Sequence, residues 1–261
     1  MSADEPITPA GLAESNLDLQ VAAQCVELSQ LAYRDPEQGA RVAARSGYTR
    51  FTAIDSRGGR DYAIIVSDAD RHFVAFRGSD EPLDWLTNLA IWRAKTSMGS
   101  VHRGYHRTSQ ALLPALQAEL QSLHTGPVVF TGHSMGGALA LLCALGVPLA
   151  NDADHSIYTF GQPKIGGPSF AEHVRGRSDL DYFRFVHGAD AIAVWGLGER
   201  AFIGTPCYFD YRGRLVIDRA TADLPKVGLH FHRMAQYRYL LRLNQLKARS
   251  NEENSDVTII E

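Results

Sequence analysis

One segment of the chain, residues 128–142, reads VVFTGHSMGGALALL. A β-branched and aromatic run ends at Thr131, and a helix-favouring apolar run begins at Ala138. Between them lies a G-x-S-x-G pattern, with Ser134 between Gly132 and Gly136. A strand, a sharp turn and a helix around this pattern are typical of a serine nucleophile. The segment therefore predicts a nucleophile turn with Ser134 at its apex.

The glycines of this turn have a steric reason. A nucleophile at the apex of a strained turn brings the residues two before and two after it into contact, so only very small side chains fit there. Gly132 and Gly136 occupy those positions. The helix that follows directs its free N–H groups at the site, where negative charge develops on an attacked carbonyl oxygen. The alternative is a glycine-rich helix start with an incidental serine, which leaves the two flanking elements unexplained.

Strands and helices alternate on both sides of the turn, which predicts an α/β fold with a mostly parallel central sheet and helices on both faces. The N-terminal half predicts a helix over 17–33, capped near Ser15 or Asn16, and strands over 48–54, 62–66 and 73–76. The remainder predicts helices over 107–122, 134–145, 167–175 and 230–247, strands over 128–131, 157–160 and 182–186, and a hairpin with arms 208–211 and 215–217.

The 261 residues are 45% hydrophobic and 21% charged, as in an ordinary globular domain. We expect a flexible arm over 1–15, one domain over 16–249 and a polar tail over 250–261. The formal net charge of -3 comes from mixed acids and bases, which argues against nucleic acid as a partner.

Three widely spaced cysteines indicate neither a disulfide framework nor a metal site. The first fifteen residues lack a secretory leader pattern, so the sequence predicts a cytoplasmic protein, with signal-independent secretion as the alternative. No apolar stretch reaches about eighteen residues without a charge, so no transmembrane segment is expected.

Five blocks of the chain, in order, resemble the class 3 lipase family, which has the α/β-hydrolase fold. The similarity covers about residues 62–239. The blocks are Phe76–Ser79, which resembles the oxyanion loop, Asp84–Leu89, Val101–Tyr105, the Gly132–Gly137 turn and Thr159–Gly166.

In α/β hydrolases the triad follows the order serine, acid, histidine, so the acid comes after residue 134. The resemblance places it at Asp190, although the proline-containing stretch that usually follows in the family is missing. The competing acids are Asp179, Asp181, Asp210, Asp218 and Asp223. His232 fits an H-x-M-x-x-Y ending of bacterial members and is the predicted base, while His230 is the alternative.

The oxyanion hole is expected to combine the backbone N–H of Met135 with the backbone N–H of Ser79, the latter as the resemblance implies. A short apolar helix containing Trp85 follows, and either a mobile lid or a helix packed on the core explains it. Predicted substrate-binding or supporting residues are Trp85, Asn88, His102, Tyr105 and His133. For His102 a structural role is favoured, because it precedes Ser134.

The resemblance implies a serine carboxylic ester hydrolase, foremost a triacylglycerol lipase, with no cofactor and no metal. Its partners would be a lipid or other ester and, transiently, a lipid interface. The alternatives are a phospholipase A1, a short-chain carboxylesterase, acyl transfer to another alcohol, and a catalytically inactive binding scaffold.

Overall fold

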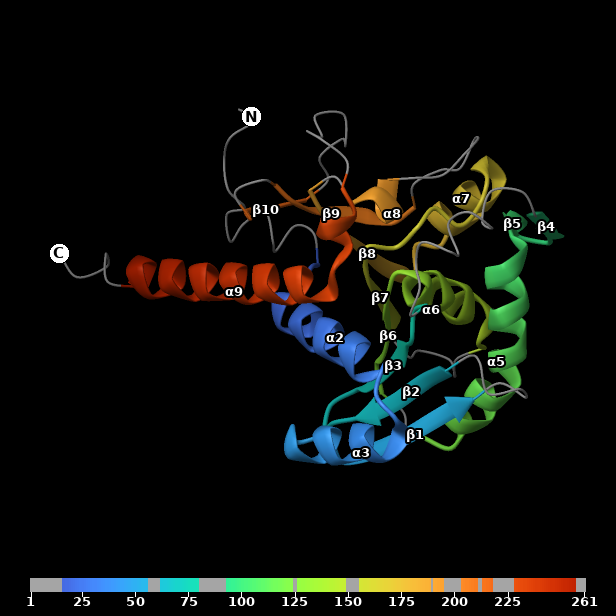
Figure 1. The fold of residues 1–261 in the computed structure, drawn as a ribbon, viewed down its shortest axis with the longest axis horizontal. Coiled ribbons are helices and arrows are strands. Elements are labelled where there is room, and N and C mark those ends of the chain that lie inside the picture. The colour runs from blue at the N-terminus through green and yellow to red at the C-terminus, as the bar shows by residue number, and fades with distance from the viewer. Residues whose placement is uncertain are drawn as a thin grey trace.

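The apolar run before Gly132 forms strand β6 (Val128–His133), which is buried along its whole length. The computed structural model describes residues 16–55, 62–79, 93–123, 126–148, 155–188, 190–194, 203–210, 213–217 and 228–256. Within these residues, eight strands form one sheet in the order β1-β2-β3-β6-β7-β8-β9-β10. Strand β6 thus lies inside the sheet, with a neighbour on each side (Figure 1).

The central strands of this sheet are parallel and its margins are antiparallel. β3, β6, β7, β8 and β9 run parallel, while β1, β2 and β10 add antiparallel neighbours. The predicted mostly parallel sheet is confirmed. The other strands are β1 (Arg50–Asp55), β2 (Tyr62–Ser67), β3 (His72–Phe76), β7 (His155–Phe160), β8 (Leu180–His187), β9 (Thr205–Phe209) and β10 (Leu215–Ile217).

Side chains alternate along the strands between two hydrophobic cores, as the two-residue period of a strand requires. Ile65 and Val74 belong to the first core, whereas Ile64 and Phe73 belong to the second. Three helices pack into the first core: α5 (Arg103–Gln121), α6 (Met135–Gly146) and α7 (Pro168–Arg175). The second core is covered by α2 (Leu19–Leu31), α3 (Pro36–Arg45) and α9 (Met234–Asp256). Helices therefore cover both faces of the sheet, as predicted (Figure 1).

Several element boundaries differ from the prediction. Helix α2 is capped by Asp18, whose carboxylate accepts from the N–H groups of Gln20 and Val21 at 2.7 and 3.0 Å, so the predicted cap near Ser15 or Asn16 is wrong. Helix α9 begins at Met234, after a short 3₁₀ turn, η2 (Leu229–His232), and continues to Asp256. The first seven residues of the proposed tail, 250–256, are therefore helical.

Some elements were not predicted. Helix α3 begins at an Asp-Pro pair, with Asp35 accepting from the N–H of Gln38, a helix-start signal that the prediction did not use. Strands β4 (Arg93–Thr96) and β5 (Gly99–His102) form a separate pair, and α8 (Ala191–Val194) is a single turn. The predicted arm over 1–15 and the apolar segment around Trp85 lie outside the described residues.

Candidate active site

Ser134 stands between the end of β6 and the start of α6, in a backbone conformation that non-glycine residues rarely adopt. Its φ is 57° and its ψ is -126°. The glycines around it allow this turn: a Cβ on Gly132 would lie 2.2 Å from the carbonyl carbon of Gly136. Such strain persists only where the surrounding structure enforces it, and it is concentrated at functional sites. The serine is thus presented at the first turn of α6, where backbone N–H groups carry partial positive charge.

The end of β3 is packed against this turn. A Cβ on Gly136 would lie 2.2 Å from the carbonyl oxygen of Phe76, and one on Gly78 would lie 3.4 Å from the Cβ of Ser134. This contact brings the segment that ends at Ser79 beside the turn that carries Ser134 and Met135. Ser79 and Met135 are both partly buried. Trp85 and Asn88, predicted beside this loop, lie outside the described residues.

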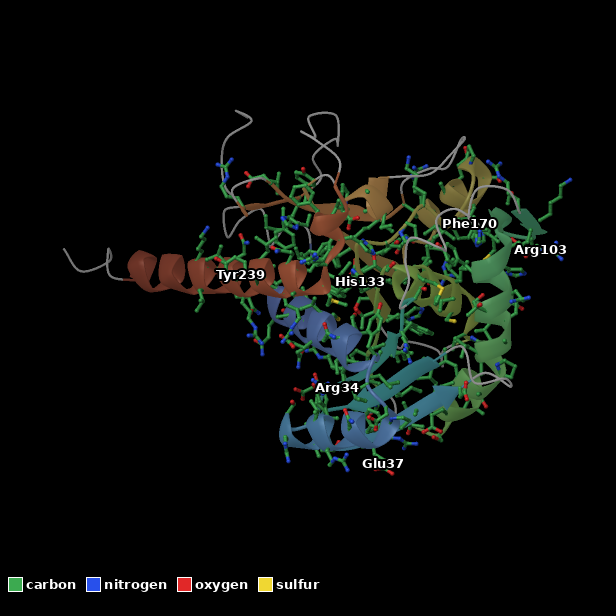
Figure 2. All side chains as sticks on the ribbon, in the orientation of Figure 1. Arg34, Glu37, Arg103, His133, Phe170 and Tyr239 are labelled. Carbon is green, nitrogen blue, oxygen red and sulfur yellow. The ribbon has the colours of Figure 1, made fainter. Side chains whose placement is uncertain are left out.

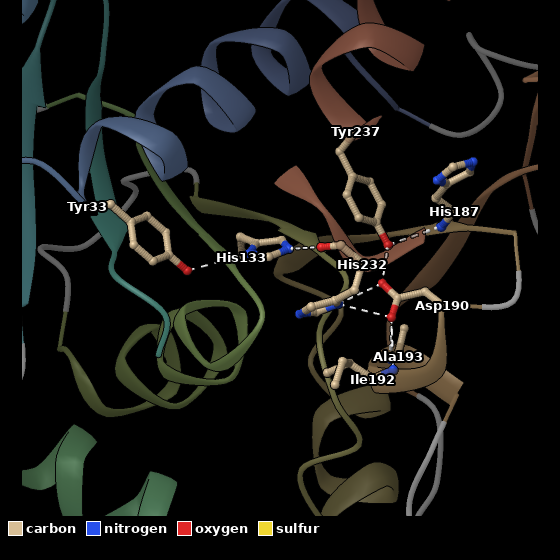
Figure 3. A network of polar contacts seen from close by, with 8 residues as sticks. All are labelled: Tyr33, His133, His187, Asp190, Ile192, Ala193, His232 and Tyr237. Atoms are coloured by element: carbon tan, nitrogen blue, oxygen red, sulfur yellow. Dashed lines mark hydrogen bonds and ion pairs between the residues drawn. The ribbon is translucent and has the colours of Figure 1, made fainter. Parts of the chain in front are cut away.

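Asp190 follows β8 and lies next to the segment that carries His232. A parallel bridge joins Asp190 to Gly228, and η2 then carries the chain to His232. The Nδ1 atom of His232 lies 3.0 and 2.9 Å from the two carboxylate oxygens of Asp190 (Figure 3). Asp190 is fully buried, and only 5% of the His232 surface is exposed.

The carboxylate of Asp190 accepts several hydrogen bonds in addition to the one from His232. Tyr237 Oη donates to it at 2.6 Å, and the N–H groups of Ile192 and Ala193, in the single turn α8, donate at 2.9 and 3.2 Å. Burial by itself raises the pKa of this carboxyl, but the hydrogen bonds and the charge of His232 hold the pKa below its ordinary value. Asp190 is therefore ionised at neutral pH.

The bond to Asp190 sets the orientation of the His232 ring. Because an ionised carboxylate only accepts, Nδ1 carries a proton and Nε2 is the atom available as a base. Nε2 is buried and has no hydrogen-bond partner among the described residues. The ring of His133, the residue before Ser134, lies beside it with 4.5 Å between ring centroids. The fold thus gathers the Ser134 turn, His232 and Asp190 at one edge of the sheet.

The loop after β7 passes close to Asp190 and His232, and this close approach requires a glycine at position 161. Its φ is +58°, and an added Cβ would lie 2.8 Å from Asp190 Oδ2 and 2.9 Å from His232 Nδ1. Any side chain here would push the carboxylate and the imidazole apart. The Thr159–Gly166 block therefore includes a residue that packs directly on the pair.

His102 and Tyr105 occupy the start of α5. His102 is its N-cap, with Nδ1 accepting from the Tyr105 N–H at 3.3 Å, and the two rings lie 4.4 Å apart. Both side chains are buried, and Tyr105 belongs to the first core. Through these contacts His102 caps α5, and a substrate-supporting role for either residue stays a prediction.

Two residues near the predicted acid and base were not assigned a role from the sequence. Tyr237 binds Asp190, and its position in the H-x-M-x-x-Y pattern was a usable signal. Tyr33, whose hydroxyl lies 3.5 Å from His133 Nδ1, carried no signal because about 100 residues separate the two. In Figure 2, His133 lies near the N-terminal end of α9, where these segments meet.

Two of the competing acids and the three cysteines have other surroundings, while Asp218 and Asp223 lie outside the described residues. Asp210 binds Arg214 at 2.7 Å, and Asp179 forms a surface pair with Arg177 at 2.7 Å. The three cysteines are free and buried, and burial raises the pKa of each thiol.

The part of the chain that is described holds no group of three His, Cys, Asp or Glu residues able to bind a metal ion. A search of the same residues for a helix that could span a membrane found none.

Comparison with known proteins finds similar sequences for the middle part of the chain. The family model described as "Lipase (class 3)" matches residues 73–195. A lipase of Rhizomucor miehei is 31% identical over 46% of this chain and 36% of its own length. The "Secreted mono- and diacylglycerol lipase 1" of Fusarium solani is 29% identical over 50% of this chain and 41% of its own. The aligned parts are thus less than half of each relative.

A solved structure gives the same fold. It is a triacylglycerol lipase whose catalytic centre is described as a serine protease triad. It superposes with a TM-score of 0.67 at 21% identity, covering 89% of this chain and 95% of that one. At this identity the likeness establishes the α/β-hydrolase fold.

The relatives also correct one expectation. The Fusarium solani enzyme and a 28% identical lipase of Malassezia globosa, matched over 36% of this chain and 31% of its own length, are both named as secreted. This conflicts with the predicted cytoplasmic location, which is wrong. The prediction relied on residues 1–15, which lie outside the described residues. The family match, the ordered motifs and the α/β-hydrolase architecture together lead to one conclusion: residues 73–195 of this chain are similar to the class 3 lipase family, and the chain has the α/β-hydrolase fold.

Proposed function

We propose that this chain is a serine hydrolase of carboxylic esters, a lipase acting on lipid esters of the triacylglycerol type. The observation that carries the proposal is the buried Asp190–His232 pair beside the strained turn of Ser134. Lipid esters are apolar, so transient contact with a lipid interface belongs to the same proposal.

In the proposed reaction, Ser134 Oγ attacks the carbonyl carbon of the ester and His232 Nε2 accepts its proton. Asp190 holds the ring tautomer and stabilises the imidazolium. The negative oxygen of the tetrahedral intermediate accepts hydrogen bonds from the backbone N–H groups of Met135 and Ser79. The alcohol leaves with the proton from His232. His232 Nε2 then accepts a proton from water as the water oxygen attacks the acyl carbon, and it returns this proton to Ser134 Oγ as the carboxylic acid is released.

The experiment compares hydrolysis of p-nitrophenyl esters of graded acyl length, and of emulsified triacylglycerol, by the wild type and by Ser134→Ala. Serine-dependent activity that rises with chain length and includes the emulsion supports a lipase. Activity confined to short, dispersed esters would indicate a carboxylesterase, and release of one acyl chain from phospholipid would indicate a phospholipase A1. Folded protein that hydrolyses no ester and is not labelled by a serine-directed phosphonate would contradict the proposal and favour an inactive binding scaffold.

The choice of base is tested by two neighbouring substitutions. His232→Ala should abolish turnover, while His230→Ala, the matched control two residues away, should be nearly normal. The opposite pattern would make His230 the base.

A further inference from the structure

His133 joins the nucleophile turn to the backbone of the proposed base. Its Nε2 lies 2.7 Å from the carbonyl oxygen of His232, and both residues are buried. Because a carbonyl oxygen only accepts, Nε2 carries a proton. Burial and the neighbouring charge of His232 lower the pKa of His133 to about 3, so the ring is neutral and Nδ1 is an acceptor.

Tyr33 supplies the donor for that acceptor. Its hydroxyl lies 3.5 Å from His133 Nδ1. Figure 3 shows the two side chains pointing toward each other. Tyr33 comes two residues after the end of α2, so it is held by an element that packs on the sheet from the second core. The contacts form a chain from Tyr33 through His133 to the main chain of His232.

The predicted oxyanion loop rests on the same two residues. The Arg77 guanidinium lies 5.8 Å from the centre of the Tyr33 ring, within the range of a cation–π contact. A Cβ on Gly78 would lie 2.3 Å from the Tyr33 hydroxyl and 2.7 Å from the carbonyl oxygen of His133. Gly78, directly before Ser79, therefore contacts both residues.

We propose that Tyr33 and His133 are positioning residues that hold the oxyanion loop and the catalytic histidine in register with each other. The inference rests on the proposed function and goes beyond it by assigning two residues outside the triad and the oxyanion hole. Their action is indirect: Tyr33 supports Arg77 and Gly78, and His133 holds the backbone of His232. An effect on the chemical step is expected, because small displacements of a base or an oxyanion donor lower the rate strongly.

The first test is Tyr33→Phe, which keeps the ring over Arg77 and removes the hydroxyl. We expect kcat to fall about 3-fold to 10-fold, with KM changed less than about 2-fold and unchanged thermal unfolding. Tyr48→Phe is the matched control, because Tyr48 is also a partly buried tyrosine against the second core, where it packs on Phe73. It should leave kcat unchanged. Equal kcat values for Tyr33→Phe and the wild type would overturn the proposal.

A double-mutant cycle separates positioning through His133 from an independent effect. His133→Gln keeps an N–H donor near the place of Nε2 but removes the acceptor for Tyr33. In this background Tyr33→Phe should cause no further loss, whereas independent effects would multiply. His133→Leu removes both bonds and should be less active than His133→Gln. The proposal would be overturned if the effects of Tyr33→Phe and His133→Gln on kcat multiplied, or if His133→Gln and His133→Leu were equally active.

Nuclear magnetic resonance gives a readout that does not depend on turnover. In ¹⁵N-histidine-labelled protein, His133 should be neutral with the proton on Nε2 from pH 6 to 8, and Tyr33→Phe should shift its Nδ1 signal. A proton on Nδ1 would contradict the inference even in a protein without esterase activity. An active enzyme labelled at Ser134, with His133 in the wrong tautomer, would leave the proposed function standing and remove only this inference.

Discussion

The imidazole Nδ1 of His232 is 2.9 Å from the carboxylate Oδ2 of Asp190, although 42 residues separate them in the chain. Asp190 is fully buried. A buried carboxylate is stable only if its hydrogen-bonding capacity is satisfied. The Asp190 carboxylate accepts hydrogen bonds from the His232 ring, from the Tyr237 hydroxyl and from two backbone N–H groups. The pair is thus held in one orientation before any substrate binds.

This orientation predicts the effect of Asp190→Asn. The amide would present an N–H group or a weaker acceptor to Nδ1, so the ring would no longer be held as the Nδ1–H tautomer with Nε2 free to act as a base. We expect kcat on a p-nitrophenyl ester to fall by roughly three to four orders of magnitude. Asp210→Asn is the matched control, because that buried carboxylate binds Arg214, and it should keep most of the activity. The reverse pattern would move the acid to Asp210.

Tyr237→Phe removes one donor from the same carboxylate. The hydroxyl donates to Asp190 at 2.6 Å and accepts from the N–H of His187 at 3.1 Å, so the variant leaves a buried carboxylate and a partly buried N–H with one partner fewer. The free energy of unfolding should fall by about 1–3 kcal/mol, and kcat by about 3-fold to 10-fold. Urea unfolding and steady-state kinetics measure the two effects. Unchanged stability and turnover would mean that this hydrogen bond is energetically neutral.

The buried, neutral ring of His133 predicts a loss of stability in acid. Its pKa is about 3 in the folded state against an ordinary value of 6.5, so between these values the unfolded chain binds a proton that the folded chain does not. The stabilisation associated with the lowered pKa of His133 is complete above pH 6.5. As pH falls below this value, the free energy of unfolding decreases by up to about 1.4 kcal/mol per pH unit. Urea unfolding at pH 7, 6 and 5 should therefore give a shallower pH dependence for His133→Gln than for the wild type. Identical slopes would refute the prediction.

The nucleophile turn predicts a strong difference between two glycine substitutions. Gly136→Ala places a methyl group 2.2 Å from the Phe76 carbonyl oxygen, a contact with rigid backbone, so we expect destabilisation of about 3 kcal/mol or more and loss of activity. Gly167→Ala is the control: its Cβ would meet nothing closer than 3.9 Å, and its φ is -80°. That variant should be within about 1 kcal/mol of the wild type. Thermal unfolding and residual esterase activity, measured for both variants and the wild type, distinguish these outcomes.

Much of the architecture could be predicted because it is encoded locally. The parallel strands contain short β-branched and aromatic runs, and the helices α6 and α7 of the first core follow β6 and β7 at short intervals. Boundaries were less accurate where a polar side chain competed for a cap, as Asp18 did with Ser15 and Asn16. Helix α3 was missed although an Asp-Pro pair marks its start; it is short, and only the small residues Gly39 and Ala43 are buried in it.

By itself, the sequence determined the nucleophile turn, since a strand, two close-packed glycines and a helix within fifteen residues leave one local geometry for Ser134. Chain order also restricted the acid and the base to the C-terminal half. Only the tertiary structure decided which aspartate meets which histidine, that Tyr237 binds Asp190, and that Tyr33 contacts His133. The physical reason is sequence distance: these contacts span 42 to 100 residues, so they depend on how the sheet and the helices of both faces pack, which no local pattern records.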